Sequence, residues 1–382
     1  MSLLTIQPIA LISLIILAVI VFFLLLYYLA FYGRFSFRKE KKAMMTENLP
    51  PISIIIVARD ESHHLIKSLP LLLTQNYPKY EVVLVNDNSR DETPQLAIEM
   101  NNKYHNLHYV NMSSSISNIE GKKFPLAIGI QAALYQHIVF TEASCIPTSP
   151  YWLQHIATSF ARRTSVVLGH ATYEKAPGLT NRILHYDALI RSVQAFSYTI
   201  AKMPVMADGR NMAYDKQLFF NNKEQYFRHA RLPFGEDCIF VNEVVKRDAC
   251  DVIASPEAVI EQYPITFSKW LRGKRFELVS RSYYRFFPRF LLVFYNWLSF
   301  FFYAAAIVSL LILLPLKNWI AVGIAGGLIV FKIIFQYLTF GKAAKKLNER
   351  SAVPLLIFHD LLFVLMQPWI YLASKFEKSK WS

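Results

Sequence analysis

Two short β-branched runs with a helical stretch between them constrain the fold of this chain most. Residues 52–57 (ISIIIV) and 80–85 (YEVVLV) have the length and the nearly continuous apolar character of strands buried on both faces of a parallel sheet. The residues between them carry apolar side chains at helical spacing and end in a turn at Pro78. This order predicts a βαβ unit and hence an α/β domain.

Polar side chains follow directly after both predicted strands. Arg59 and Glu61 come after the first strand, and Asp87, Ser89 and Asp91 come after the second. Ligands of open α/β sheets bind at the carboxyl ends of the strands, where a carboxylate can accept hydrogen bonds from a ribose or a base edge. The alternative role, strongest for Ser89 and Asp91, is to turn the chain and cap the next helix.

Later segments continue the alternation of strands and helices. LHYVN and HIVFT read as strands, and FPLAIGIQAALYQ and PYWLQHIATSFARR read as helices. VVLGHATYE and VIASPEAVIEQ are expected to add strands near the edge of the sheet. The pattern predicts a doubly wound, mostly parallel sheet over residues 51–264.

The two ends of the chain are more apolar than those of an ordinary soluble enzyme. Hydrophobic residues make up 54% of the sequence, and the mean hydropathy is +0.26. Residues 1–33 carry no charge and include an apolar run long enough to cross a bilayer, which takes about 20 residues. They lack the basic start and cleavage site of a signal peptide. We expect an uncleaved transmembrane anchor at 1–33 and a basic linker at 34–50 on the cytoplasmic side.

The C-terminal third adds further candidate membrane segments. A basic and aromatic segment at 265–289 predicts an amphipathic helix at the membrane surface, with a helix buried against the sheet domain as the alternative. Residues 290–375 predict two to three transmembrane helices, and 376–382 form a tail. Pro368 breaks the last apolar stretch and basic residues follow it, so four full spans would put those charges outside. A re-entrant or surface-lying last helix removes this conflict.

The net charge of +14 does not indicate nucleic acid as a partner. The lysines and arginines cluster beside the apolar stretches, where they mark topology and meet anionic headgroups. Lys332 and Asp360 lie inside apolar runs and are expected to contact a lipid phosphate or each other. Cys145, Cys238 and Cys250 form no C-x-x-C pair, so neither a disulfide framework nor a structural zinc site is implied.

An ordered series of segments over residues 51–285 resembles one enzyme family. SIIIVARDE, EVVLVNDNSRDET, GKKFPLAIGI, FTEASCIPTSPYWL, GRNMAYDKQLF, FGED and a weaker KWLRGKRF look like the family-2 inverting glycosyltransferases, in a bacterial membrane-anchored type. The resemblance implies a GT-A fold, a UDP- or GDP-sugar donor, Mg²⁺ or Mn²⁺ as cofactor, and inversion in a single displacement. It also implies a lipid, lipid-linked or saccharide acceptor. The cytoplasmic catalytic domain would then belong to a multi-pass protein of the cell inner membrane that acts in cell-envelope glycan biosynthesis.

The resemblance also assigns roles to individual residues. Asp237 in FGED matches the general base that acts on the acceptor hydroxyl, with Glu236 beside it, and paired carboxylates can raise one pKa. The alternative for Asp237 is an acidic N-cap of the helix that follows. The nucleotide is assigned to Ala58, Arg59, Glu61, Asp87 and Lys122, and the donor sugar to Asp208, Gly209, Arg210 and Asn211.

Two segments depart from the family pattern. In TEASC, Glu142 and Ser144 replace the D-x-D aspartates that hold Mg²⁺ or Mn²⁺ on the diphosphate. Either Glu142 carries the metal with waters and phosphate oxygens, or basic residues neutralise the diphosphate without it, or catalysis is impaired. GKRF replaces Q-x-x-R-W: it keeps Arg275 for the diphosphate but has Gly273 and Phe276 in place of Gln and Trp.

These departures leave a second function class open. A catalytically impaired glycosyltransferase-like subunit of a membrane glycan-synthesis assembly would keep the fold without the turnover, and a transport component is a further alternative. His63 and His64 are adjacent on the predicted helix, so they are not expected to converge on a metal ion. They read as surface or core histidines.

Overall fold

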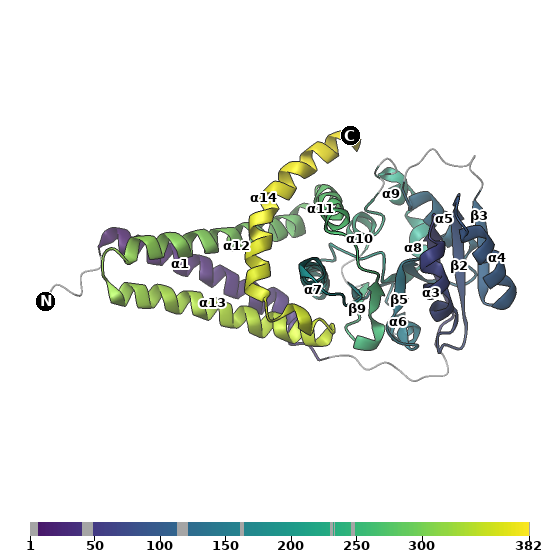
Figure 1. Ribbon diagram of the computed structural model, residues 1–382, viewed down its shortest axis with the longest axis horizontal. Helices are drawn as coiled ribbons and strands as arrows, with labels where there is room; N and C mark the ends of the chain where they lie inside the picture. Colours follow the sequence, from purple (N-terminus) through teal and green to yellow (C-terminus); the bar gives the residue numbers. More distant parts are fainter. Residues whose placement is uncertain are drawn as a thin grey trace.

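The computed structural model describes residues 7–39, 49–112, 121–160, 164–229, 232, 234–245 and 249–381. Residues 40–48 of the predicted basic linker lie outside this range. An α/β domain and a bundle of long helices make up the two ends of the molecule, and three helices lie where the two parts meet (Figure 1). These three helices are α7 (Leu179–Ile200), α11 (Phe267–Arg281) and α14 (Leu356–Trp381).

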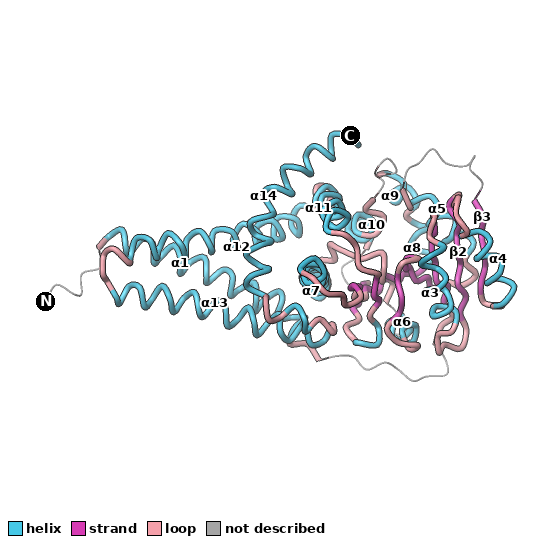
Figure 2. The backbone as a smooth tube through the Cα atoms, in the orientation of Figure 1, coloured by secondary structure: helices cyan, strands magenta, loops and turns pink. Residues whose placement is uncertain are grey.

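The main sheet has seven strands in the order β3-β2-β1-β4-β8-β6-β9 (Figure 2). The first four run parallel to one another, whereas β8 runs antiparallel to both of its neighbours. This arrangement confirms the predicted α/β fold class with a mostly parallel sheet. The strands are β1 (Ile52–Ala58), β2 (Tyr80–Asp87), β3 (Leu107–Met112), β4 (His137–Glu142), β6 (Val166–Leu168), β8 (Met212–Asp215) and β9 (Cys250–Val252).

Helices cover both faces of this sheet. Alternate residues of β1 point to opposite faces, and apolar side chains lie on both of them. Ile54 and Ile56 join one buried core and Ile55 and Val57 the other, so every residue of the strand is buried. Gly129 allows one helix to lie close to β1, since a Cβ there would stand 2.7 Å from Ile55 Cγ2. The covering helices are α3 (Ser62–Leu73), α4 (Thr93–Lys103), α5 (Lys123–Ala132) and α6 (Trp152–Phe160).

A second, three-stranded sheet follows the order β5-β10-β7. The predicted single strand VVLGHATYE is divided between the two sheets: β6 ends before Gly169, and β7 begins two residues later. This small sheet matters for the site because it brings the end of β10 beside the TEASC segment. Its strands are β5 (Cys145–Pro147), β7 (Ala171–Tyr173) and β10 (Ile260–Gln262); the short helices α8 (Lys216–Asn221), α9 (Lys223–Arg228) and α10 (Cys238–Val244) complete the domain.

In the part of the chain that the structure describes, four helices are long and apolar enough to cross a membrane by length and composition: one near the N-terminus and three in the C-terminal third. The first combines α1 (Pro8–Leu26), a π-helical segment (Tyr27–Tyr32) and α2 (Gly33–Ser36); the others are α12 (Phe286–Leu313), α13 (Trp319–Lys346) and the apolar part of α14. The first helix, α12 and α13 lie side by side, and α14 runs steeply across them (Figure 1).

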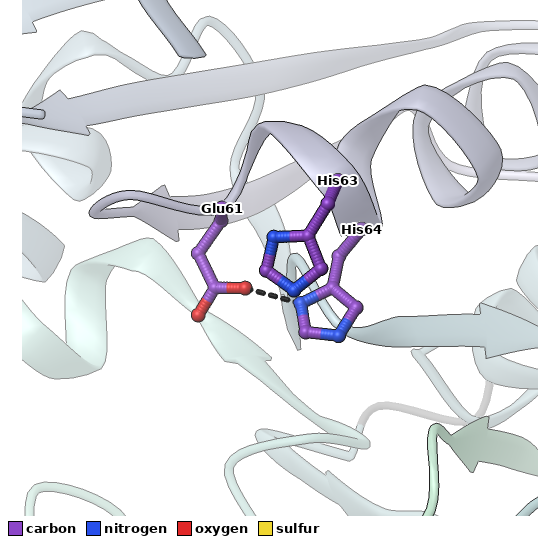
Figure 3. Close-up of side chains that lie close together, drawn as sticks. All are labelled: Glu61, His63 and His64. Atoms are coloured by element: carbon purple, nitrogen blue, oxygen red, sulfur yellow. Dashed lines mark hydrogen bonds and ion pairs between the residues drawn. The ribbon is translucent and has the colours of Figure 1, made fainter. Parts of the chain in front are cut away.

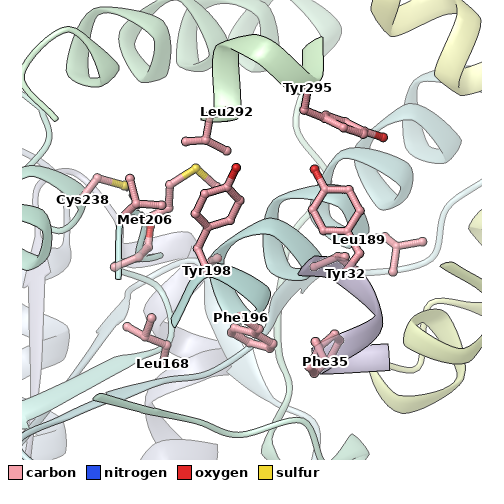
Figure 4. Close-up of a cluster of buried hydrophobic side chains, with 14 of the residues drawn as sticks. Tyr32, Phe35, Leu168, Leu189, Phe196, Tyr198, Met206, Cys238, Leu292 and Tyr295 are labelled. Atoms are coloured by element: carbon pink, nitrogen blue, oxygen red, sulfur yellow. Dashed lines mark hydrogen bonds between the residues drawn. The ribbon is translucent and has the colours of Figure 1, made fainter. Parts of the chain in front are cut away.

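The long helix α7, which the sequence did not reveal, joins the two parts. Sixteen of its 22 residues are buried, polar and apolar ones alike, so it lacks the one-sided apolar stripe that predicts a helix. Phe196 and Tyr198 of α7 pack among Tyr32, Phe35 and Tyr295 from the membrane helices (Figure 4). The α/β domain and the bundle therefore share one hydrophobic core.

The two charges inside the apolar helices contact each other. Lys332 Nζ lies 3.4 Å from Asp360 Oδ2, and the Tyr303 hydroxyl donates to the same oxygen at 2.7 Å. The pairing of the two side chains with each other, one of the two expected arrangements, is thus observed. A paired and hydrogen-bonded charge is the form that an apolar environment tolerates.

Candidate active site

A cavity of about 320 Å³ opens at the carboxyl ends of the parallel strands. Its lining comes from β1, β4, the start of α5, the loop before β8, the start of α10 and one face of α11. Seven of the predicted site residues line it together: Lys122, Glu142, Asp208, Gly209, Arg210, Glu236 and Asp237. The structure thus gathers segments that are more than 100 residues apart in the chain into one cavity.

The adjacent carboxyls Glu236 and Asp237 stand at the start of α10. Asp237 Oδ1 accepts the Cys238 N–H at 2.6 Å, which is an N-cap interaction, and its Oδ2 accepts the Gly209 N–H at 2.9 Å. Burial raises the pKa of Asp237, and the negative charge of Asp208 adds to the rise. Burial likewise raises the pKa of Glu236 to about 7, with Asp237 adding to it. Asp237 therefore both caps α10 and lines the cavity.

An arginine clamp holds the loop that the resemblance assigned to the donor sugar. Arg210 donates to both oxygens of Asp208, from Nε at 2.9 Å and from NH2 at 2.7 Å, and its NH1 donates to Gln262 Oε1 at 2.9 Å. Burial alone would raise the pKa of Asp208, but this arginine holds it well below its usual range. The backbone of Gly209 contacts Asp237, although a Cβ there would also fit, at an ordinary contact distance of 3.5 Å from Asp237 Oδ2.

Asn211, the next residue of that loop, faces the protein interior and does not line the cavity. Its Nδ2 donates to the carbonyls of His170 and Ala258, and its Oδ1 accepts from Trp152 Nε1 at 3.1 Å. The side chain therefore ties both sheets and α6 together behind the loop. Asn211 thereby supports the neighbouring Arg210, and its own amide group does not face the cavity.

The TEASC segment is occupied by donors from the protein itself. Lys122 Nζ donates to Glu142 Oε1 at 2.6 Å, and Gln262 Nε2 donates to Glu142 Oε2 at 3.3 Å and to Ser144 Oγ at 3.0 Å. Burial alone would raise the pKa of Glu142, but Lys122 holds it below its usual value. Mg²⁺ and Mn²⁺ require several unobstructed oxygen ligands. A dication bonded to Glu142 would stand against the Lys122 ammonium, so this donor set does not fit the metal that the resemblance implies.

The predicted nucleotide-binding residues lie at the neighbouring strand ends. Arg59 NH1 lies 3.8 Å from Asp87 Oδ2, and burial raises the pKa of Asp87 while Arg59 opposes the rise. Ala58 at the end of β1 pairs with Asn86 at the end of β2. Asp91 accepts the backbone N–H groups of Ser62 and Thr93, which is the turn-and-cap role left open for it.

The expectation that the adjacent histidines do not converge is wrong. Glu61, His63 and His64 each offer one ligand atom, and these atoms lie within 4.8 Å of one another (Figure 3). His64 Nδ1 stands 2.5 Å from Glu61 Oε2, and the two imidazole rings are 3.8 Å apart between centroids. The convergence arises because His63 and His64 sit in the first turn of α3, where their rings turn back toward Glu61. Glu61 is thereby engaged with His64 beside the nucleotide end of the site.

Some cavity residues were not predicted, and seven predicted residues lie outside the lining: Ala58, Arg59, Glu61, Asp87, Ser144, Asn211 and Arg275. Arg191, Gln262 and Phe276 line the cavity, whereas Arg275 does not. Phe276 stacks on Phe234 with ring centroids 4.5 Å apart. Arg191 comes from α7, which the sequence did not reveal, and Gln262 comes from the last strand of the small sheet. The GKRF segment thus predicted the correct helix, α11, but Phe276 lines the cavity instead of the predicted Arg275.

The fold and the site together define the class: an α/β domain of the GT-A kind attached to candidate membrane helices. Residues 53–219 match the model of the family described as glycosyl transferase family 2. This match covers the segments from SIIIVARDE to GRNMAYDKQLF, which carry most of the resemblance described above, and agrees with it.

Two curated proteins and one solved structure illustrate this relationship. Glycosyltransferase AglE from Haloferax volcanii is 26% identical over 177 residues, which are 46% of this chain and 54% of that protein. The 4,4'-diaponeurosporenoate glycosyltransferase from Staphylococcus haemolyticus is 30% identical over 138 residues, 36% of this chain and 35% of that protein. The chain thus spans about half or less of the length of these relatives.

The structure of mannosyltransferase PcManGT from Pyrobaculum calidifontis, in complex with GDP-Man and Mn²⁺, superposes with a TM-score of 0.56. The match covers 87% of this chain and 99% of that one at 18% identity. At this identity, the likeness shows the shared fold.

Proposed function

We propose that the protein is a membrane-bound, nucleotide-sugar-dependent inverting glycosyltransferase acting on a lipid, lipid-linked or saccharide acceptor. One observation carries the proposal: a single cavity at the strand ends joins a clamped donor loop, a lysine–glutamate pair and a carboxyl pair of raised pKa. Both curated relatives are glycosyltransferases by name, and PcManGT holds GDP-Man on the same fold.

Asp237 is the proposed general base. In a single displacement, the acceptor oxygen attacks the anomeric carbon while the bond from that carbon to the diphosphate breaks. The electron pair leaves with the diphosphate, and the acceptor proton passes to Asp237. Two backbone N–H groups fix the carboxylate and leave lone pairs on both oxygens, and its raised pKa suits a group that must accept a proton.

The remaining residues would bind and orient the donor. Asp87 is placed to meet the nucleoside at the end of β2, and the Lys122 ammonium to meet the diphosphate. Arg210 and Gln262 hold the loop on which the sugar would rest. Phe234 and Phe276 stack on each other in the lining, and this apolar surface would limit the entry of water.

The membrane helices would hold this site at the cytoplasmic face of the inner membrane. Lys346, at the end of α13 nearest the α/β domain, donates to the backbone carbonyls of Phe35 and Arg38 at the end of the first helix. Basic residues thus gather where both helices meet the domain, as the positive-inside rule favours for a cytoplasmic domain. Because α14 runs across the bundle, we place it along the membrane surface rather than through it.

The test is transfer by the purified full chain in lipid, with a panel of UDP- and GDP-sugars and acceptor lipids or saccharides. Donor-dependent product of inverted anomeric configuration is expected, and it should disappear in Asp237→Asn. Nucleotide binding without hydrolysis or transfer on any donor would instead support the impaired-subunit alternative, which the occupied TEASC segment motivates.

A further inference from the structure

The charges around the diphosphate end of the cavity are already balanced by the protein. Glu142 and Asp208 are negative, and Lys122 and Arg210 lie 2.6 Å and 2.7 Å from them as positive partners. Arg191 lines the same cavity, and its partner there is Glu277, whose carboxylate lies 3.7 Å away. A metal-binding D-x-D site has the opposite character, because its excess negative charge attracts the dication.

The oxygens that a metal would use are also engaged. Both oxygens of Glu142 accept hydrogen bonds, one from Lys122 and one from Gln262, and Ser144 Oγ accepts from the same Gln262 amide. Both oxygens of Asp208 accept from Arg210. Glu142 and Asp208 thus each have a cationic partner on at least one of their oxygens.

Lys122 is built to meet an anion. Its side chain is about half exposed to the cavity, although its ammonium contacts Glu142. An ammonium has three N–H donors, so two of them can point to phosphate oxygens while the third stays on Glu142. Lys122 is also the N-cap residue of the ten-residue helix α5, whose positive end faces the same space.

We infer that the Lys122 ammonium, held by Glu142, takes the place of the divalent cation, so that this site binds a nucleoside diphosphate without metal. The inference rests on the proposed function and deepens it. As the bond from the anomeric carbon to the diphosphate breaks, the electron pair stays on the diphosphate oxygen. Lys122 and the start of α5 stabilise the added negative charge there. Glu142 is then a positioning residue, and its serine neighbour is compatible with this role because no second metal ligand is needed.

The first experiment measures the affinity of the full chain for UDP and for GDP by calorimetry, in EDTA and again in excess Mn²⁺. We expect the nucleotide that binds to do so in EDTA with an affinity within about threefold of that in Mn²⁺. Lys122→Met should lower this affinity by about tenfold or more, the ratio of a lost charge-assisted contact. The control is Lys79→Met, an exposed lysine at the opposite end of β2, which should leave the affinity unchanged.

A second variant tests the inference by a gain of metal dependence. Glu142→Asp with Ser144→Asp restores both carboxylates and shortens the reach to Lys122, so nucleotide binding should weaken in EDTA and recover in Mn²⁺. The thermal stability of each variant shows whether it is folded. Wild-type binding that requires Mn²⁺, or full affinity in Lys122→Met, would overturn the inference while leaving the proposed transferase intact. Absence of UDP and GDP binding under both conditions would overturn both proposals.

Discussion

The cavity at the strand ends and the contact between α7 and α11 both contain buried carboxyl groups. Their pKa values shift in opposite directions: upward for Glu236 and Asp237, downward for Glu277. In the cavity, Glu236 Oε2 has no hydrogen-bond partner among the described residues, and burial raises the pKa of Glu236 and of Asp237. At the helix contact, Lys274 and Arg281 lie 2.7 Å and 2.6 Å from Glu277, whose side chain also borders the cavity.

These partners change the outcome of burial for Glu277. Burial alone would raise its pKa, but Lys274, Arg191 and Arg281 hold it well below its usual range. Under-satisfied carboxyls whose pKa approaches neutrality are suited to proton transfer, and saturated ones are suited to holding helices together. The same residue type therefore indicates chemistry in one region and architecture in the other.

Glu349 extends the second group to the connection between α13 and α14. Its buried carboxylate lies 2.8 Å from His185 Nδ1 and 3.3 Å from His170 Nε2, and it also accepts from the Thr172 hydroxyl. The His170 carbonyl accepts from Asn211, behind the donor loop. Glu349, in the connection between α13 and α14, is thus linked through His170 to Asn211, a residue of the loop that would hold the sugar.

The largest expected effect is on catalysis. Asp237→Asn removes the proposed base and keeps one oxygen to cap α10, but its amide nitrogen cannot accept the Gly209 N–H; transfer should fall by about 10²- to 10⁴-fold with a small drop in melting temperature. The matched control is Asp215→Asn, because Asp215 caps α8 in the same way outside the cavity. Equal losses in the two variants would show that capping, and not proton transfer, is the role of Asp237.

The helix contact should respond in stability instead. Glu277→Gln leaves three cations without their shared counter-charge, and the free energy of unfolding should fall by about 3–5 kcal/mol. Thermal unfolding in detergent measures the loss, and the exposed Glu99→Gln on α4 is the control. A variant as stable as the wild type would remove the distinction between the two regions.

Much of this arrangement could be predicted from the sequence, for identifiable reasons. The runs at β1 and β2 gave the parallel sheet because buried strands leave a β-branched signature that needs no knowledge of partners. FGED led to the cavity through its resemblance to the family pattern. The N-cap alternative also holds, because the capping residue and the proposed base are the same side chain, Asp237.

Other features depend on distant contacts and left no local signal. The helix α7 is buried on all sides, so its polar and apolar residues show no period that predicts it. The pairs Lys122–Glu142 and Gln262–Ser144 join residues 20 and 118 positions apart, and only the sheet brings them together. TEASC therefore read as a weakened metal site, although the structure fills it with a lysine and an amide.

Glu349→Gln should produce an effect that depends on pH. Burial alone would raise the pKa of Glu349, but the two histidines hold it at about 2, against 4.5 for an ordinary glutamate. A lowered pKa contributes stability that is present above pH 4.5 and is lost as the pH falls toward 2. The contribution is about 3 kcal/mol from 1.36 kcal/mol per pH unit. Melting temperatures from pH 7 to pH 3 should fall more steeply in the wild type than in the variant; parallel curves would contradict this role.

The smallest expected effect concerns Glu236. Its stability contribution depends on pH with the opposite sign to that of Glu349, because its pKa is raised and not lowered. The raised pKa of Glu236 means that its protonated form is favoured in the folded state, so its stability contribution is present below pH 4.5 and is lost as the pH rises through 7. Ionisation above pH 7 also adds a negative charge beside the anionic donor. The donor KM should then rise by roughly tenfold, the ratio given by about 1.4 kcal/mol of repulsion. Glu236→Gln, which mimics the protonated form, should show a flat KM from pH 6 to 8.5. A wild-type rise that persists in Glu236→Gln would assign it to another group and leave Glu236 without a role in the charge of the cavity.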